Sequence, residues 1–156
     1  MRWKENIDFN NRAIRLSAES VKGKRALDLP MTDVVHSLLV ARRQLGDGTF
    51  VFPSYGETGH IGDPRTYIAI VEEATGIEFS SHDLRRTFIT TAEACDISVY
   101  ALKALVNHTL GSDVTAGYVG MTVERLREPA QKVCDRLKTL CGIEEPKGNK
   151  VKRLRS

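Results

Sequence analysis

Polar and apolar residues alternate along the first thirty positions, whereas most of the later chain follows a helical period. Residues 7–9 and 13–16 alternate in polarity on either side of Asn10-Asn11, which predicts a β-hairpin. A third strand is expected at residues 25–29, where Pro30 ends the pattern. The first thirty residues are therefore predicted to form a small antiparallel β-element.

Helices are predicted where apolar residues recur three and four positions apart between start and stop signals. A short buried element at residues 50–53 separates the first helix, which reaches Gly46, from the second, which stops at Thr75-Gly76. The fold class is therefore α+β and mainly α, with the β-element first. The expected helix starts are Thr32 or Asp33, Asp63-Pro64, Ser80, Ser98 and about Thr122.

The third predicted helix and the last one carry further local signals. Ser80 and Asp83 have the spacing of a capping box, and Leu84 and Phe88 contribute to an apolar side of the third helix. The last helix ends near residue 140 and can be kinked at Pro129. Residues 144–156 are polar and basic, which predicts a disordered tail.

Composition narrows the class of protein. The 156 residues suit one domain with a single core, and 41% of them are hydrophobic. A net charge of +3 does not by itself indicate nucleic-acid binding, although basic residues cluster at 22–25 and at 147–155. No apolar run approaches the roughly 20 residues that span a bilayer, and no signal peptide is visible. We therefore expect no membrane partner and a cytoplasmic or nucleoid-associated location.

Metal and cofactor chemistry is not expected. The three cysteines lack C-x-x-C spacing, which argues against zinc and indicates reduced thiols, with Cys95 and Cys134 packed in helices. No Walker-type loop, no G-x-G-x-x-G segment and no cluster of acidic residues suited to two metal ions is visible. If the chain transfers phosphoryl groups, these absences favour covalent catalysis without a metal ion.

Four side chains could support such chemistry on a DNA phosphate. His82 and Arg85 lie three apart and therefore share one face of a helix. Arginine neutralises charge on phosphoryl oxygens, and histidines such as His82 and His108 hold or move protons near neutral pH. Tyr118 can serve as the nucleophile of a covalent intermediate.

Each of these residues also has an ordinary structural interpretation. His82 could be a surface histidine near a helix start, and His108 could be a helix C-cap side chain. Tyr118 lies among glycine and polar residues and could be a loop tyrosine. Arg86 points about 100° away from Arg85 on a helix, so we interpret it as a solvated charge.

The sequence around these residues resembles the tyrosine recombinase (phage integrase) family. The matching segments are S-H-D-L-R-R-T-F at 81–88, L-V-N-H at 105–108 and T-A-G-Y at 115–118. The family's usual motifs, in chain order, are H-x-L-R, L-G-H and T-x-x-Y. Asn107 replaces the usual glycine, and the spacer between His108 and Tyr118 is one residue longer than is common. Either departure could shift the tyrosine loop slightly, but neither removes a reactive group.

The resemblance implies a role for each catalytic residue. Tyr118 would attack the scissile phosphate and form a 3′-phosphotyrosyl link, so rejoining would need no ATP and no metal. Arg85 would hold the non-bridging oxygens, His82 would assist proton transfer at the tyrosine, and His108 would hydrogen-bond the phosphate. Lys22 matches the hairpin lysine that protonates the leaving 5′ hydroxyl, although a solvated turn lysine is the ordinary alternative.

The resemblance also implies the extent of the domain and its partners. Residues 1–143 would form a partial catalytic domain of the tyrosine recombinase type, and 144–156 would be the basic tail. The expected partner is double-stranded DNA, on which the family assembles as a homo-oligomer, a tetrameric synapse. A bacterial or phage source, as part of a mobile element, is implied as well.

One catalytic residue of the family has no counterpart in this sequence. Met1-Arg2-Trp3 resembles the L-R-W that opens the family's first strand, and the family's first catalytic arginine precedes that strand in a T-G-x-R-x-x-E segment. The chain is therefore expected to begin too late to contain this arginine, and its recombination activity is expected to be impaired.

Other functions stay open at this point. A non-catalytic DNA-binding remnant or regulator derived from an integrase would bind DNA without forming a covalent adduct. A type IB topoisomerase uses similar residues, but the short phage-style segments argue against it. Serine-dependent transposases and resolvases are disfavoured, because no serine has this set of residues around it.

Overall fold

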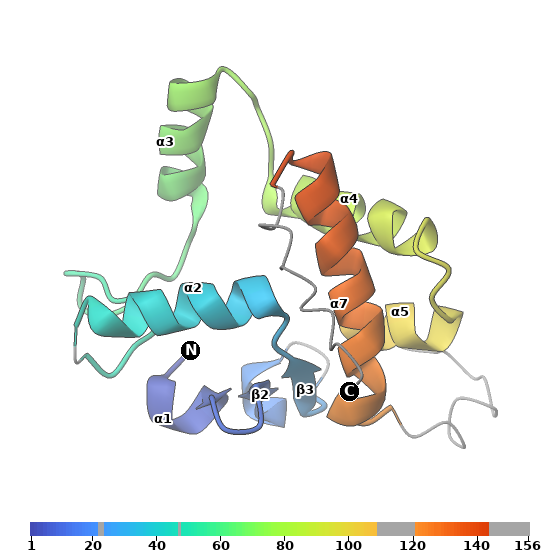
Figure 1. Ribbon diagram of the computed structural model, residues 1–156. Helices are drawn as coiled ribbons and strands as arrows, with labels where there is room; N and C mark the ends of the chain where they lie inside the picture. Colours follow the sequence, from blue (N-terminus) through green and yellow to red (C-terminus); the bar gives the residue numbers. More distant parts are fainter. Residues whose placement is uncertain (22–23, 47, 109–120, 144–156) are drawn as a thin grey trace, which may run out of the picture.

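The structure, a computed structural model, describes residues 1–21, 24–46, 48–108 and 121–143 (Figure 1). A small sheet and its flanking short helices come first, and the longer helices follow, so the predicted α+β, mainly α class is confirmed. The elements are α1 (Trp3–Asn6), β1 (Ile7–Asp8), β2 (Ala13–Leu16), the 3-10 helix η1 (Ala18–Ser20), β3 (Leu27–Pro30), α2 (Asp33–Gln44), α3 (Arg65–Thr75), α4 (Ser81–Glu93), α5 (Val99–Leu105) and α7 (Val123–Leu140).

The three strands form one antiparallel sheet in the order β1-β2-β3. Ile7 pairs with Ile14, as the predicted hairpin requires. Leu16 pairs with Leu27 of β3, which starts two residues later than the strand predicted at 25–29 and includes Pro30. The turn between β1 and β2 occupies residues 9–12, where the Asp8 carboxylate accepts hydrogen bonds from the side chain and backbone of Asn11 at 2.8 and 2.9 Å. These two bonds hold the pKa of Asp8 below its ordinary value.

The prediction of β-structure is wrong at residues 3–6, which form the single helical turn α1. The Asn6 side chain explains this turn, because its Oδ1 accepts a hydrogen bond from the Arg2 backbone N–H at 2.6 Å. Trp3 is buried, and its backbone N–H donates to the Thr49 carbonyl at 3.1 Å. The start of the chain is therefore held by residues nearly fifty positions away.

A first group of buried side chains joins the N-terminal segment to α2. Trp3, Met31, Leu39 and Val51 form this cluster, and partly buried residues of the sheet and of α2 pack against it. Val51 is 1% exposed, as expected for a buried element at 50–53, but Phe52 is 44% exposed. The burial of this short segment is therefore confined to one of its faces.

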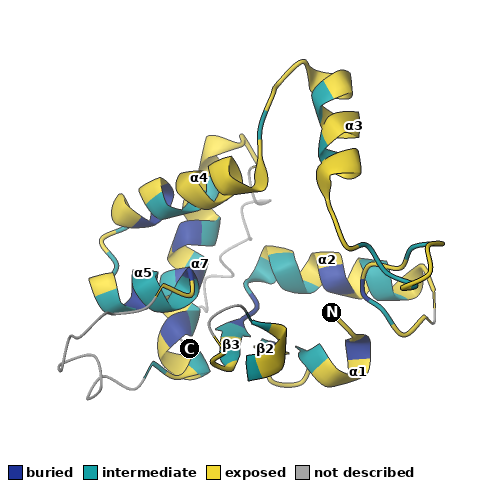
Figure 2. Cartoon of the chain, turned by 180° about the vertical axis from the view of Figure 1, so that it is seen from behind, coloured by how far each residue is buried: buried dark blue, intermediate teal, exposed yellow. Residues whose placement is uncertain are grey.

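A second group of buried side chains lies where α7 packs against β3, α4 and α5 (Figures 1 and 2). Leu126, Ala130 and Val133 recur three and four positions apart on α7, which places them on one face of the helix. Thr91 and Ala92 are the buried residues of α4, and Ala101 is that of α5. This packing makes α7 the central helix of the C-terminal half.

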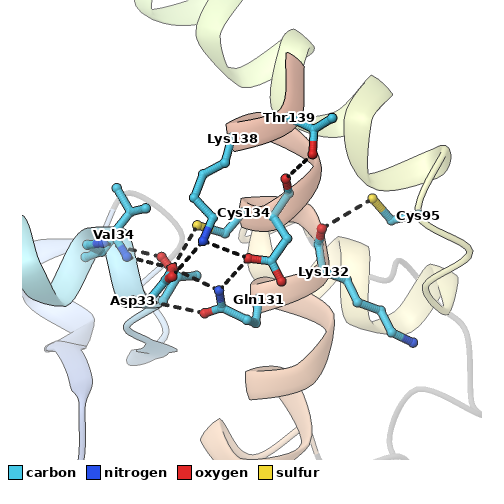
Figure 3. A network of polar contacts seen from close by, with 11 residues as sticks. Asp33, Val34, Cys95, Gln131, Lys132, Cys134, Lys138 and Thr139 are labelled. Carbon is cyan, nitrogen blue, oxygen red and sulfur yellow. Dashed lines mark hydrogen bonds and ion pairs between the residues drawn. The ribbon is translucent and has the colours of Figure 1, made fainter. Parts of the chain in front are cut away.

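Polar contacts fasten α7 to α2 (Figure 3). Lys138, near the end of α7, has a side chain that is 10% exposed and donates to the Asp33 carboxylate at 2.7 Å. Gln131 donates to the same carboxylate at 2.8 Å and accepts a hydrogen bond from the Asp33 backbone N–H at 3.1 Å. We call Asp33, Gln131 and Lys138 the α2–α7 clamp.

Arg127 fastens the other end of α7 to the turn between β1 and β2. Its guanidinium donates to the carbonyls of Asn11 and Arg12 at 2.6 and 3.2 Å. Glu124 accepts two further hydrogen bonds from the same guanidinium, which raises the pKa of Arg127 and lowers that of Glu124. Helix α7 is thus attached to the N-terminal half near both of its ends.

Helix α3 differs from the other long helices, because none of its residues is buried. Tyr67, Ile70 and Val71 follow a helical spacing but are 50%, 57% and 46% exposed, and the helix stands away from the rest of the chain (Figure 1). Its start differs slightly from the expectation, since Pro64 is the N-cap residue and the Asp63 carboxylate accepts the Arg65 N–H. None of the described helices has the length and apolar character needed to cross a membrane.

Candidate functional site

Helix α4 carries two of the expected catalytic side chains, and its first turn is fixed by the predicted capping box. The Ser80 hydroxyl accepts from the Asp83 N–H at 3.3 Å, and the Asp83 carboxylate accepts from the Ser80 N–H at 3.0 Å. Hydrogen bonds from Ser80 hold the pKa of Asp83 below its ordinary value. The cap fixes the start of the helix just before His82 and Arg85, both of which are exposed.

The Arg85 side chain reaches from α4 to the end of α5. Its Nη2 atom donates a hydrogen bond of 2.6 Å to the carbonyl of Val106, the C-cap residue of α5. His108 is two residues further along the chain. Residues 21 positions apart in the sequence are therefore brought into contact, and the arginine of the H-x-x-R segment lies beside the segment that contains His108.

The C-terminus of α5 has the hydrogen bonds of a Schellman motif. The Asn107 N–H donates to the Ala104 carbonyl at 3.1 Å, and the His108 N–H donates to the Lys103 carbonyl at 2.8 Å. Asn107 adopts a left-handed backbone with a φ of 48°. His108 therefore helps to end α5 through its backbone N–H, and the residue is exposed.

The geometry bears on three of the predicted catalytic residues. His82 and Arg85 share α4, and Arg85 contacts the carbonyl two residues before His108. Lys22 and Tyr118 lie outside the described residues, as do the predicted tail at 144–156 and the whole T-A-G-Y segment at 115–118. The catalytic roles of all five residues stay predictions.

Sequence reasoning did not identify the contact partner of Arg85. Val106 contributes only its backbone carbonyl, and no side-chain pattern marks a carbonyl as a hydrogen-bond acceptor. Asn107 did carry a signal, because asparagine and glycine are the residues that most often end helices in the left-handed conformation. Asn107 therefore meets a backbone requirement that a glycine would also meet.

One group of side chains has the composition of a metal site. Ligand atoms of Asp33, Cys134 and Asp135 lie within 4.8 Å of one another. The Lys138 ammonium already lies 2.7 Å from Asp33 and 3.1 Å from Asp135, so a positive charge occupies this group. Burial also raises the pKa of the Cys134 thiol, which disfavours the thiolate that would bind a metal. These contacts fit a structural network that joins two helices.

The cysteines partly match their predicted positions. Cys134 lies in α7, as expected, whereas Cys95 lies in the turn after α4 and its thiol contacts the Lys132 carbonyl at 3.7 Å. The helix ends earlier than predicted because Asp96 takes a positive φ of 51°, which interrupts the helical backbone. The three cysteines carry free thiols, and Cys141 is exposed.

Comparison with known proteins adds one finding. The chain matches the family profile described as "Phage integrase family" over residues 1–125, which is most of its 156 residues. The matched range includes α4, α5 and the H-x-x-R and N-H segments. No curated protein and no solved structure matches the chain.

Proposed function

The chain belongs to the phage integrase family, and from this premise we propose that it cleaves and rejoins DNA through a 3′-phosphotyrosyl intermediate. Site-specific recombination is the general activity of this family, and DNA is its substrate. The observation that carries the proposal is the contact between Arg85 and the end of α5. This contact brings together two of the sequence segments that resemble recombinase motifs.

The proposed reaction needs no metal ion and no other cofactor. The Tyr118 hydroxyl attacks the scissile phosphorus, and the bond to the 5′ oxygen breaks as the tyrosine–phosphorus bond forms. His82 assists the removal of the tyrosine proton, which a free tyrosine with a pKa of about 10 holds at neutral pH. Lys22 donates a proton to the leaving 5′ oxygen. Rejoining is the reverse reaction with a second 5′ hydroxyl.

Arg85 and His108 stabilise the charge that develops on the phosphate. Arginine has five N–H donors, and within the described residues the Arg85 guanidinium uses one of them, to Val106. The other donors are available for two non-bridging oxygens, and His108 supplies a further hydrogen bond. A preorganised donor of this kind contributes roughly 10²–10³ to the rate.

The substrate is duplex DNA, bound mainly through its phosphates. Such binding weakens steeply with salt, because phosphate contacts release condensed counterions. We propose that copies of the chain assemble on DNA as a homo-oligomer and that residues 1–143 form the catalytic domain. The 156 residues contain no T-G-x-R segment, so the reaction of this polypeptide alone is proposed to be slow.

A nicked substrate tests the proposal directly. When the nick lies close to the scissile phosphate, the short leaving fragment diffuses away and the covalent protein–DNA adduct accumulates. We expect a low yield of adduct from the 156 residues, and a higher yield when a T-G-x-R-x-x-E segment is joined before Met1. The adduct should be absent in both forms of Tyr118→Phe, which keeps the ring and removes the nucleophilic oxygen.

The outcomes separate the proposal from its alternative. An adduct that persists in Tyr118→Phe would show that a different residue is the nucleophile. If neither form makes an adduct but both bind DNA in a salt-dependent way, the chain is a non-catalytic DNA-binding remnant. DNA affinity that does not change with salt would argue against both functions.

A further inference from the structure

We propose that Asn107 is a positioning residue: its left-handed backbone ends α5, which leaves the Val106 carbonyl to Arg85, and it turns the His108 side chain toward the same site. This inference rests on the proposed function and deepens it. It assigns a role to a residue that has no reactive group of its own. The proposal stands on the backbone angle of Asn107, on the bonds that end α5 and on the contact of Arg85.

The carbonyl groups at the end of α5 accept hydrogen bonds from different donors. The N–H groups of Asn107 and His108 donate to the carbonyls of Ala104 and Lys103, respectively, one turn back along the helix. The Val106 carbonyl lies beyond this pattern and accepts the Arg85 guanidinium at 2.6 Å. The last carbonyls of a helix carry partial negative charge, so a cation is favourable at this place.

The left-handed conformation at residue 107 makes this arrangement possible. At a φ of 48° the chain reverses after Val106, and both N–H groups that follow turn back to the helix. Glycine adopts this conformation without steric cost and asparagine with little, whereas a β-branched residue is a strong outlier there. A valine at position 107 would therefore draw the backbone toward a negative φ.

Two chemically important groups depend on this one residue. The peptide plane that holds the Val106 carbonyl ends at the Cα of Asn107, and the next peptide plane runs from that atom to the Cα of His108. A rotation at Asn107 thus changes the direction of His108 relative to the anchor of Arg85. Because a misplacement of about 1 Å can cost about 10² in rate, such a rotation matters even when both side chains are intact.

A set of substitutions at this position separates backbone conformation from side-chain chemistry. Asn107→Gly keeps access to the left-handed conformation and removes the amide, whereas Asn107→Val disfavours that conformation. Adduct formation on the nicked substrate is measured in a single turnover, with enough protein to saturate the DNA and well below the melting temperature of each variant. DNA affinity and the folded fraction are measured in parallel.

We expect Asn107→Gly to stay within about threefold of the wild-type rate, and Asn107→Val to lose at least about tenfold. DNA affinity should change by less than about threefold in both variants, because phosphate contacts elsewhere dominate it. A merely structural role would lower the folded fraction of Asn107→Val and leave the rate per folded molecule unchanged. That result would overturn the proposal.

A second readout does not depend on catalysis. The hydrogen bond to Val106 should protect the Arg85 guanidinium protons from exchange with water, and we expect this protection to fall by about tenfold in Asn107→Val and to persist in Asn107→Gly. Nuclear magnetic resonance of the free protein measures it. If the wild type forms no adduct, the proposed function fails while this measurement still decides the positioning role. Equal protection in all three proteins, or equal loss in both variants, would overturn it.

Discussion

Two junctions between helices hold this molecule in different ways. At the α2–α7 clamp, the Asp33 carboxylate accepts hydrogen bonds from both Lys138 and Gln131, and the Gln131 side chain also accepts the Asp33 N–H. At the junction of α4 and α5, Arg85 reaches Val106 through a single hydrogen bond to a backbone carbonyl. The first junction has several contacts that can compensate for one another, and the second depends on an exposed side chain.

The difference separates scaffold from site. A nearly buried lysine is stable only when its charge is paired, so the clamp fixes the relative position of the two helices. Arg85 is exposed, and within the described part of the chain its guanidinium uses one donor, so it can exchange or share its partner when an anion arrives. The comparison therefore predicts that changes at the clamp act on stability, whereas changes at Arg85 act on chemistry.

The largest effect is expected from Arg85→Ala. Loss of one preorganised charge donor should reduce the rate of adduct formation on a nicked substrate by about 10²–10³, with little loss of stability because the side chain is exposed. The matched control is Arg86→Ala, which removes an exposed arginine from the next position and should stay within about threefold at saturating DNA. Equal losses in the two variants would show that general charge, and not a specific contact, governs the rate.

Asp33→Asn should reveal the opposite behaviour at the clamp. It removes the charge that faces Lys138 and should lower the free energy of unfolding by about 1–3 kcal/mol, with the adduct rate per folded molecule unchanged. Denaturant titration measures the change. Lys138→Met removes the cation and keeps a long apolar side chain, so the loss in the double variant should be smaller than the sum of the two single losses. Strict additivity would mean that the two residues do not interact.

The clamp should also make stability depend on pH in the acid range. Hydrogen bonds from Lys138 and then Gln131 hold the pKa of Asp33 well below its ordinary value of about 3.9. A carboxyl group with a lowered pKa in the folded state stabilises the protein above its unfolded pKa and loses that contribution as the pH falls. At pH values below about 4, the free energy of unfolding should therefore decrease as the pH is lowered further.

Asp33→Asn isolates this contribution from those of the other carboxyl groups. Asp8, Asp63, Asp83 and Glu124 also have lowered pKa values, so they contribute to acid sensitivity in the same direction. The difference in unfolding free energy between wild type and Asp33→Asn should shrink as the pH falls from about 5 to 2. A difference that stays constant over this range would exclude an ionised Asp33 as its source.

The smallest effect is expected at the cap of α4. Ser80→Ala removes the hydroxyl that accepts from Asp83 and should cost about 1 kcal/mol of stability, with a slightly lower adduct rate if the first turn of α4 frays beneath His82. Ser37→Ala is the control, because Ser37 is exposed within α2 and its change to alanine should be neutral or slightly stabilising. Thermal unfolding of both variants measures the difference.

Local signals allowed much of the fold to be predicted. The caps at Thr32, Ser80 and Ser98 are present as expected, because capping depends on residues only three positions apart. The hairpin of β1 and β2 follows from alternation and turn residues for the same reason. The candidate site was also expected in its residue types, although that expectation came from a resemblance to a family.

The remaining features depend on contacts that the sequence does not display. Leu84 was expected on the apolar side of α4 but is 57% exposed, because helical spacing does not show which neighbours cover a face. Lys138 would be read as a surface lysine, yet it is buried against Asp33, 105 residues earlier. The single turn at Trp3 depends likewise on burial against distant residues and on the hydrogen bond from the Arg2 N–H to Asn6.

The attachments of α7 also set the order in which the chain can fold. Asp33 meets its partners 98 to 105 residues later, and Asn11 meets Arg127 116 residues later. At a synthesis rate of about 5–20 residues per second, the N-terminal half waits roughly 5–20 seconds on the ribosome before α7 exists. Contacts of such long separation slow folding, since a large loop must close before they form. During that interval the face of β3 that α7 later covers is open to chaperones.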